Sequence, residues 1–315
     1  MSRAVRVAID DASAMLAASG VDSPRADAEW LLAHVLGVSR GRLLVADDLD
    51  DVTAHEFDEL VGARARRVPL QHLTGSASFG PVDLLVGPGV FVPRPETELL
   101  YEWAVGQARA AIGAGAFGGP GETLTIVDLC SGSGALAIAL AVAVPSARLH
   151  AVEKSDEAAK WLCRNVERAG LRDRVGIHVG DATDSRAVLS FLDGPVELVV
   201  SNPPYVPRNA AVSREVLADP EMAVFGGDDG MSVITPMVEV IAQILCPGGQ
   251  VGIEHDDSTS GSVVGAVAAT GAFAGAEVHR DLVGRPRFVT ARRRAGWASE
   301  SSAPGADDAR ARMDR

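Results

Sequence analysis

The second half of the chain alternates short apolar runs with helical patterns, and this alternation limits the possible folds more than any other feature. Apolar runs typical of buried strands lie at Thr125–Leu129, Arg148–Glu153, Val175–Val179, Val196–Ser201 and 250–254. Helical patterns fall between them at 134–144, 156–169, 186–192 and 231–245. Because strand–helix–strand units build parallel sheets, we predict an α/β fold with a doubly wound, mostly parallel sheet.

Upstream of the sheet the chain is helical. Residues 5–67 have amphipathic helical spacing and lack strand signals. The apolar runs 79–86 and 90–92 surround a Gly/Pro turn at 87–89, which predicts a β-hairpin, and 93–111 continues as a helix.

Downstream of the alternation, the runs 276–282 and 287–292 flank a Gly-Arg-Pro turn and predict an antiparallel pair. The last residues lack apolar side chains that could dock them, so we expect a disordered tail. The predicted organisation is a helical domain at 1–75, a hairpin linker at 76–93, an α/β domain at 94–294 and the tail at 295–315.

Charge and cysteine content narrow the classes of partner. The formal net charge of −13 argues against a nucleic-acid backbone as the main partner, since such binding depends on clustered Lys and Arg. The three cysteines form no CxxC pair, and we expect no metal site. No signal peptide or membrane-spanning run is apparent, so we expect a cytoplasmic protein without a membrane partner. We also expect the protein to be a monomer.

A glycine-containing loop follows the first strand of the predicted sheet. Asp128 opens it, and Cys130, Ser131, Gly132, Ser133 and Gly134 complete it. The loop matches neither the dinucleotide fingerprint G-x-G-x-x-G nor a Walker loop, so a sulfonium nucleoside such as S-adenosylmethionine fits better than a nucleotide. Asp128 could bind the ammonium group of such a ligand, and the glycine turn could face its carboxylate and ribose.

Acidic residues end the next two strands. Glu153 lies about twenty residues after the loop, where a carboxylate can bind both ribose hydroxyls. Asp181, followed by Ala182, ends the third strand and could accept the adenine amino group, although a helix N-cap is an equally good interpretation.

The fourth strand leads into Asn202-Pro203-Pro204-Tyr205. The Asn202 side-chain carbonyl and the Pro203 main-chain carbonyl could accept both hydrogens of a planar –NH2 group, and Tyr205 could lie against its face. Carboxyl ends of parallel strands share one sheet edge, so these four strand ends predict one methyl-transfer site.

Taken together, these motifs resemble a known family. The sheet region is similar to class I S-adenosylmethionine-dependent methyltransferases with a Rossmann-like sheet. Residues 5–293 resemble the HemK/PrmC family, the glutamine N5-methyltransferases of peptide chain release factors. The segments that carry this resemblance are 69–75, 79–80, 92–98, 128–134, 202–205, 226–230 and 284–287. One departure is Cys130, which stands where the family usually has a glycine; we expect binding to survive and the turn there to avoid positive φ.

The resemblance implies a substrate, the glutamine of the Gly-Gly-Gln motif in class I release factors, with S-adenosylhomocysteine as the second product. It implies that Phe91, Arg94 and Pro95 help to line the substrate pocket together with residues 202–205. It also implies that the helical domain docks the release factor.

Three alternatives remain open at this stage. An adenine-N6 nucleic-acid methyltransferase would share Asn-Pro-Pro-Tyr but needs a nucleic-acid-binding surface. A ribosomal-protein glutamine methyltransferase resembles the chain less at 93–98. A non-catalytic factor that binds S-adenosylmethionine would not need the intact tetrapeptide.

Overall fold

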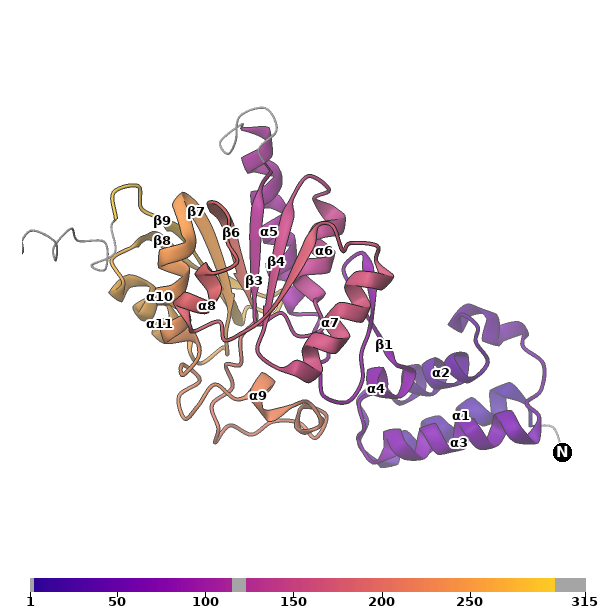
Figure 1. The fold of residues 1–315 in the computed structure, drawn as a ribbon. Coiled ribbons are helices and arrows are strands. Elements are labelled where there is room, and N and C mark those ends of the chain that lie inside the picture. The colour runs from indigo at the N-terminus through magenta and orange to yellow at the C-terminus, as the bar shows by residue number, and fades with distance from the viewer. Residues whose placement is uncertain (1–2, 115–122, 298–315) are drawn as a thin grey trace, which may run out of the picture.

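The computed structural model describes residues 3–114 and 123–297, and its centre is one large sheet (Figure 1). The seven strands are β3 (Thr125–Leu129), β4 (Arg148–Glu153), β5 (Val175–Val179), β6 (Val196–Ser201), β7 (Leu245–Glu254), β8 (Phe273–Arg280) and β9 (Pro286–Arg293). Their order is β5-β4-β3-β6-β7-β9-β8. Strands β3 to β7 are mutually parallel, and β9 is antiparallel to both neighbours. The predicted mostly parallel sheet with a final antiparallel hairpin is confirmed.

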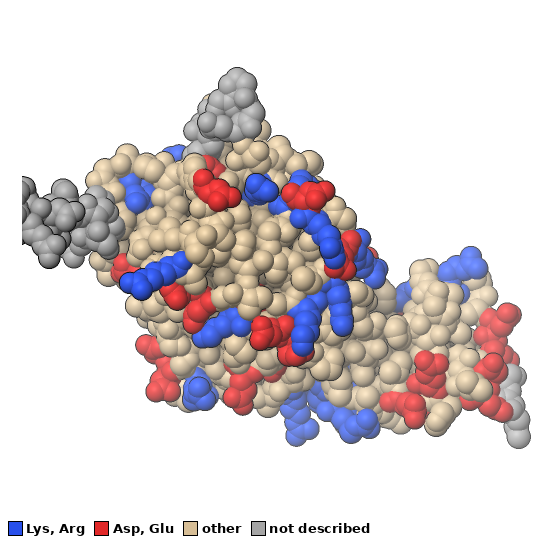
Figure 2. Space-filling view, viewed as in Figure 1, with Lys and Arg blue, Asp and Glu red and all other residues tan. Residues whose placement is uncertain are grey.

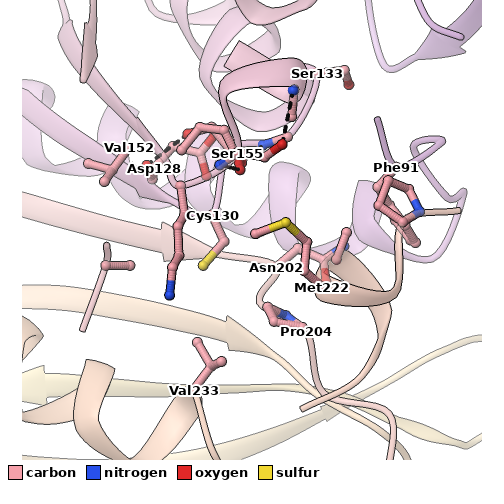
Figure 3. Close-up of a pocket in the computed structure, with 18 of the residues that line it drawn as sticks. Phe91, Asp128, Cys130, Ser133, Val152, Ser155, Asn202, Pro204, Met222 and Val233 are labelled. Carbon is pink, nitrogen blue, oxygen red and sulfur yellow. Dashed lines mark hydrogen bonds between the residues drawn. The ribbon is translucent and has the colours of Figure 1, made fainter. Parts of the chain in front are cut away.

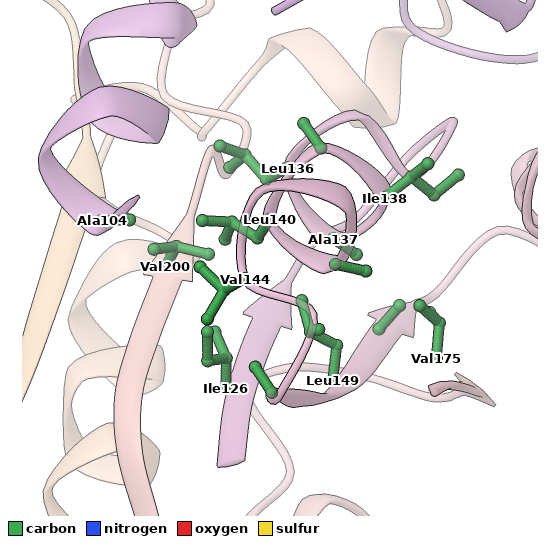
Figure 4. Packing of buried hydrophobic residues seen from close by; sticks show 14 of the residues in the cluster. Ala104, Ile126, Leu136, Ala137, Ile138, Leu140, Val144, Leu149, Val175 and Val200 are labelled. Atoms are coloured by element: carbon green, nitrogen blue, oxygen red, sulfur yellow. The ribbon is translucent and has the colours of Figure 1, made fainter. Parts of the chain in front are cut away.

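Helices cover both faces of the sheet. One face packs α5 (Thr97–Gly113), α6 (Ala135–Ala143) and α7 (Asp156–Arg168), and the other packs α8 (Ser185–Leu189), α10 (Ile234–Ile244) and α11 (Ser260–Ala269). Successive strand residues point to opposite faces, so Ile126 joins the first core and Val127 the second. Figure 4 shows Ile126 and Leu149 beneath Leu140 of α6. This two-sided burial explains why the strands are continuous apolar runs.

Helix α11 was not predicted. Its sequence consists of Gly, Ser, Ala and Val, which are weak helix formers apart from alanine. Burial of Val263 and Val267 against the sheet provides the stabilisation that intrinsic helix propensity lacks.

The N-terminal helices lie to one side of the sheet (Figure 1). They enclose a separate apolar core. These helices are α1 (Val5–Ala18), α2 (Pro24–Val35), the 3-10 helix η1 (Arg40–Val45), α3 (Asp51–Ala65) and α4 (Leu70–Thr74). Pro24 occupies the first turn of α2, where its missing N–H costs nothing, and Asp50 caps α3 by accepting a hydrogen bond from the Thr53 N–H at 2.8 Å. Leu31 and Phe57 are fully buried in this core.

The hairpin was predicted around the wrong turn. It pairs β1 (Ser76–Phe79) with β2 (Val82–Leu85) across Gly80-Pro81, and 90–92 is not a strand. Among the described residues, no third strand pairs with β2 at Leu85, because the side chain of Asn165 already binds the backbone groups of that residue. It accepts from the Leu85 N–H at 2.7 Å and donates to the Leu85 carbonyl at 2.9 Å.

The segment after β6 crosses the carboxyl edge of the sheet and carries the short helices η2 (Val216–Ala218) and α9 (Glu221–Val224), seen below the strands in Figure 1. Figure 2 shows basic and acidic side chains interspersed on the visible face. Among the described residues, none of the helices combines the length and apolar character needed to cross a membrane.

Candidate active site

A cavity of about 360 Å³ lies at the carboxyl ends of β3 to β6 (Figure 3). It brings together most of the residues that the sequence placed at one sheet edge. The predicted residues in its lining are Phe91, Asp128, Cys130, Ser131, Gly132, Ser133, Glu153, Asp181, Ala182, Asn202 and Pro204. The predicted residues outside its lining are Arg94, Pro95, Gly134, Pro203 and Tyr205.

Asp128 is the most deeply buried acid of the cavity, with 1% of its surface exposed. Its Oδ2 accepts a hydrogen bond from the Ala137 N–H at 3.2 Å, whereas Oδ1 is buried without a hydrogen-bond partner. Burial raises the pKa of this carboxyl to about 7. A buried orphan acceptor beside a cavity is suited to a cationic ligand group.

The loop after β3 turns sharply at Cys130. Its φ is 63°, so the expectation that the turn avoids positive φ at this position is wrong. The following residues are fixed, because the Ser131 N–H donates to the Val152 carbonyl at 2.9 Å and the Gly132 N–H to Glu153 at 2.7 Å. The chain must therefore reverse at Cys130 itself, and a left-handed conformation does this.

Gly134 supports the loop from outside the cavity. Its φ is 89°, and a Cβ there would lie 2.5 Å from Leu162 and 2.9 Å from Ile138. The glycine is therefore required for the start of α6 to pack against α7, which is a different role from the predicted ligand contact.

Glu153 connects β4 to the glycine loop. Its Oε2 accepts from the Gly132 N–H and its Oε1 from the Ser155 N–H, both at 2.7 Å. Burial raises the pKa of this carboxyl although these backbone hydrogen bonds oppose the shift. Each carboxylate oxygen can accept a second hydrogen bond, so the side chain can hold its loop and still bind two hydroxyls.

Asp181 faces the same cavity from the end of β5. Its Oδ2 accepts from Lys154 Nζ at 2.7 Å, and its Oδ1 accepts from the Thr183 N–H at 2.9 Å. Burial would raise its pKa, but the Lys154 and Thr183 hydrogen bonds outweigh burial and lower it. The helix N-cap is Asp184, whose side chain accepts from the first amides of α8, so the N-cap interpretation of Asp181 is wrong.

Asn202 enters the cavity from the end of β6, and Figure 3 shows it beside Met222 and Pro204. Its Nδ2 donates to the hydroxyl of Thr97 at 3.0 Å. The carbonyl Oδ1 of Asn202 is thereby left to accept hydrogen bonds from a ligand.

Tyr205 lies elsewhere than predicted. Its hydroxyl donates to Glu254 Oε1 at 2.9 Å, and its ring packs on the core of the α10 face. A buried phenol needs an acceptor, and Glu254 at the end of β7 provides one. The neighbouring Pro203 is also buried and is not a lining residue.

Arg94 and Pro95 stabilise the wall of the cavity and do not line it. Arg94 forms an ion pair with the buried Asp219 and lies over the Phe91 ring at 4.9 Å. Asp219 also accepts from the Val92 N–H at 3.2 Å. Pro95 forms the turn into α5, where its carbonyl accepts from the Glu98 N–H.

Sequence reasoning missed one side of the cavity. The residues that form it come from 220–233 and are Pro220, Met222, Ala223, Phe225, Ser232 and Val233. The Gly-Gly-Asp-Asp-Gly run was the available signal. A Cβ at Gly226 would lie 2.5 Å from the Pro204 carbonyl oxygen, and one at Gly230 would lie 2.3 Å from the Tyr205 carbonyl oxygen. The run therefore packs backbone to backbone against the tetrapeptide.

The donor set of the cavity fits S-adenosylmethionine. The orphan Oδ1 of Asp128 suits an ammonium group, and Glu153 retains acceptor capacity for ribose hydroxyls. The apolar lining supplied by Leu136, Val152 and Phe225 suits the uncharged parts of the ligand.

Comparison with known proteins identifies the family. Residues 8–75 match the PrmC N-terminal domain, and residues 120–223 match the methyltransferase small domain. The release factor glutamine methyltransferase of Mycolicibacterium smegmatis is 51% identical over 290 residues, which cover 92% of this chain and 98% of that protein. Those of Corynebacterium glutamicum and Streptomyces coelicolor are 48% and 44% identical and cover 91% and 90% of this chain and 98% and 96% of their own lengths. The chain belongs to the family of release factor glutamine methyltransferases.

Proposed function

We propose that this chain methylates the side-chain amide nitrogen of the glutamine in the Gly-Gly-Gln motif of class I release factors. The observation that carries the proposal is the orientation of Asn202, whose Nδ2 is engaged by Thr97 at 3.0 Å, so that its Oδ1 can accept an N–H from the substrate. The names of the relatives support a release factor as the substrate. Such a substrate implies a cytoplasmic enzyme.

The amide nitrogen of glutamine is a poor nucleophile, because its lone pair is delocalised into the carbonyl. S-adenosylmethionine would supply the electrophilic methyl group, which is bonded to its sulfonium sulfur. After transfer of the methyl group, the rest of the donor is the neutral thioether S-adenosylhomocysteine. Asn202 Oδ1 accepts one N–H of the substrate amide. The main-chain carbonyl of Pro203, which lies between the two lining residues Asn202 and Pro204, accepts the other. Both contacts strengthen as positive charge develops on nitrogen.

These two acceptors also orient the nitrogen for in-line attack on the methyl carbon. Good orientation can supply roughly 7–11 kcal/mol of a reaction barrier. As the new C–N bond forms and the C–S bond breaks, the nitrogen becomes cationic, and it then releases a proton to water. The Asn202 side chain and the Pro203 carbonyl need only to bind and aim the amide, and no strong base is required.

We further propose that the helical domain at 1–75 docks the release factor. Large apolar side chains are exposed there, with Leu44 91%, Val45 76% and Val52 77% exposed. The net charge of −13 supports a protein partner over a nucleic acid, and we expect the enzyme to act as a monomer.

The test uses labelled donor with four acceptors: the release factor, the same factor with its Gly-Gly-Gln glutamine replaced, DNA and RNA. We expect label on the unaltered factor alone, and label on nucleic acid would overturn the proposal.

Asn202→Ala should lower kcat by about 100-fold or more while donor binding, measured by calorimetry, persists. Near-normal turnover of this variant would remove the role assigned to Asn202.

A further inference from the structure

The turn that joins β8 to β9 has no part in the reaction described above. It contains the Gly-Arg-Pro run that carries part of the family resemblance. Two neighbouring apolar side chains project from it, with Leu282 100% exposed and Val283 74% exposed. Leu282 therefore adds nothing to the apolar core of the described chain, and its burial by another molecule would be favourable.

Hydrogen bonds hold this turn, residues 281–285, in one shape. Asp281 Oδ1 accepts from the N–H groups of Val283 at 3.0 Å and Arg285 at 2.8 Å. Asp281 Oδ2 accepts from Arg287 Nε at 2.9 Å, and the Asp281 carbonyl accepts from the Gly284 N–H at 2.9 Å. Because the turn is already ordered, a partner that binds it loses little free energy to ordering.

The base of the hairpin is anchored in the core. Phe288 of β9 is buried, and the His279 ring of β8 stacks on it with ring centroids 4.4 Å apart. The other neighbour of Phe288 is Trp103 of α5, at 6.2 Å between ring centroids. The turn thus projects from a base that packing holds in place.

The turn lies at the same edge of the sheet as the cavity. Phe288 pairs with Glu254 at the carboxyl end of β7, and the His255 N–H donates to the Arg287 carbonyl at 2.9 Å. The residues before β9 therefore extend beyond the edge where β6 leads into Asn202. Since β9 is two strands from β6 and neighbouring strands are about 4.8 Å apart, the hairpin lies roughly 10 Å from β6 across the sheet.

The small size of the turn limits which partner it fits. A stable protein–protein interface buries about 800 Å² on each partner, which corresponds to a patch roughly 30 Å across. Two side chains cannot supply that area, so this turn alone would not hold a second copy of the chain. A protein substrate seated over the cavity would cover a patch of that width, and a turn roughly 10 Å away lies within it.

The charge of the hairpin end indicates the chemistry of the partner. Residues 280–287 contain three arginines and one aspartate, in a chain whose formal net charge is −13. The Arg285 side chain is exposed at the turn. Arginine is enriched at protein interfaces, where it pairs with carboxylates. The turn therefore suits an apolar protein surface with acidic residues at its border.

Building on the proposed function, we infer that the turn 281–285 is a docking point for the release factor, which it binds through Leu282 and Val283. The cavity binds the glutamine, and the turn binds the folded factor beside its Gly-Gly-Gln loop. Since the turn is not in the cavity lining, it should affect the affinity for the factor and not the methyl transfer itself.

The first experiment measures kcat and KM for the release factor with the double variant Leu282→Ser/Val283→Ser. We expect KM to rise about 10-fold, as on truncation of anchoring side chains in a protein interface, with wild-type kcat at saturating factor. The matched control is Leu189→Ser in α8, which lies beside β5 at the other end of the sheet and is also exposed. This control should keep the wild-type KM.

The second experiment measures binding without turnover, by calorimetry, with a release factor whose Gly-Gly-Gln glutamine is replaced. The Kd should rise in the double variant by the same factor as KM and stay unchanged in Leu189→Ser. Because the substituted side chains lie in water, both variants should keep the wild-type melting temperature.

Wild-type KM and Kd in the double variant would overturn the docking point. So would a wild-type dimer in sedimentation that the double variant loses, because the turn would then bind a second copy. Failure of the wild-type enzyme to methylate the release factor would instead overturn the proposed function.

Discussion

At the scale of single residues, Cys130 holds a backbone conformation that is costly for an L-amino acid. Its φ of 63° lies in the left-handed region. We expect Cys130→Gly to keep or raise the melting temperature, and Cys130→Val to destabilise the protein by roughly 1–3 kcal/mol, because a β-branched side chain is strained there. The control is Cys163→Val, which makes the same substitution on the exposed surface of α7, at a residue with a helical φ. Equal effects of the two valine variants in denaturant titrations would contradict this account.

Asp128 makes the stability of the ligand-free protein depend on pH. Burial raises its pKa from 3.8 to about 7, so the folded state binds a proton that the unfolded state releases. Its contribution to stability is complete below pH 3.8 and is lost as the pH rises through about 7. In urea titrations across that range, Asp128→Asn should show a shallower loss of stability than the wild type. Burial also raises the pKa of Glu254, to about 7, and the pKa values of Glu153 and Asp219, so these carboxyls contribute to the slope that remains.

At the scale of elements, the Gly226–Gly230 run and the Asn-Pro-Pro-Tyr loop form one packed unit. A Cβ at Gly226 would meet two backbone oxygens, of Pro204 at 2.5 Å and Gly230 at 2.7 Å. We expect Gly226→Ala to cost roughly 1–3 kcal/mol of stability through overpacking and to lower kcat by displacing the loop. Gly261→Ala in α11, where a Cβ meets nothing within 4 Å, should leave both unchanged. Differential scanning calorimetry and a turnover assay check both variants, and wild-type behaviour of Gly226→Ala would refute the expectation.

The features that could be predicted from the sequence are those that follow from the regular alternation of strands and helices. All five parallel strands were found, and Asp128, Glu153, Asp181 and Asn202 meet at one edge because parallel strands end there. The other side of the cavity depends on long-range packing of 220–233, which has no periodic pattern. The orientation of single side chains was equally inaccessible, since the turn of Tyr205 toward the core depends on a carboxylate 49 residues away.

At the scale of the whole molecule, three charged residues join the helical domain to the segment that covers the cavity. Arg64 and Arg67 of the helical region bind Glu215 with N–O distances of 3.0 Å and 2.6 Å. We expect Glu215→Gln to cost about 1.5–3 kcal/mol of stability and to raise KM for the release factor, with unchanged donor affinity. Asp10→Asn breaks an exposed pair with Arg25 and should cost about 1 kcal/mol or less. Equal urea midpoints and equal KM for the two variants would contradict a role of this junction.

The antiparallel course of β9 also decides how the protein can be tethered. Phe288 pairs with Glu254 beside the cavity, and Arg292 pairs with Gln250 toward the opposite edge of the sheet. Strand β9 therefore ends at the edge of the sheet that does not bind ligand. A reporter or a surface anchor attached after this strand would leave the entrance open to a bulky protein substrate, which makes that end the natural place for immobilisation.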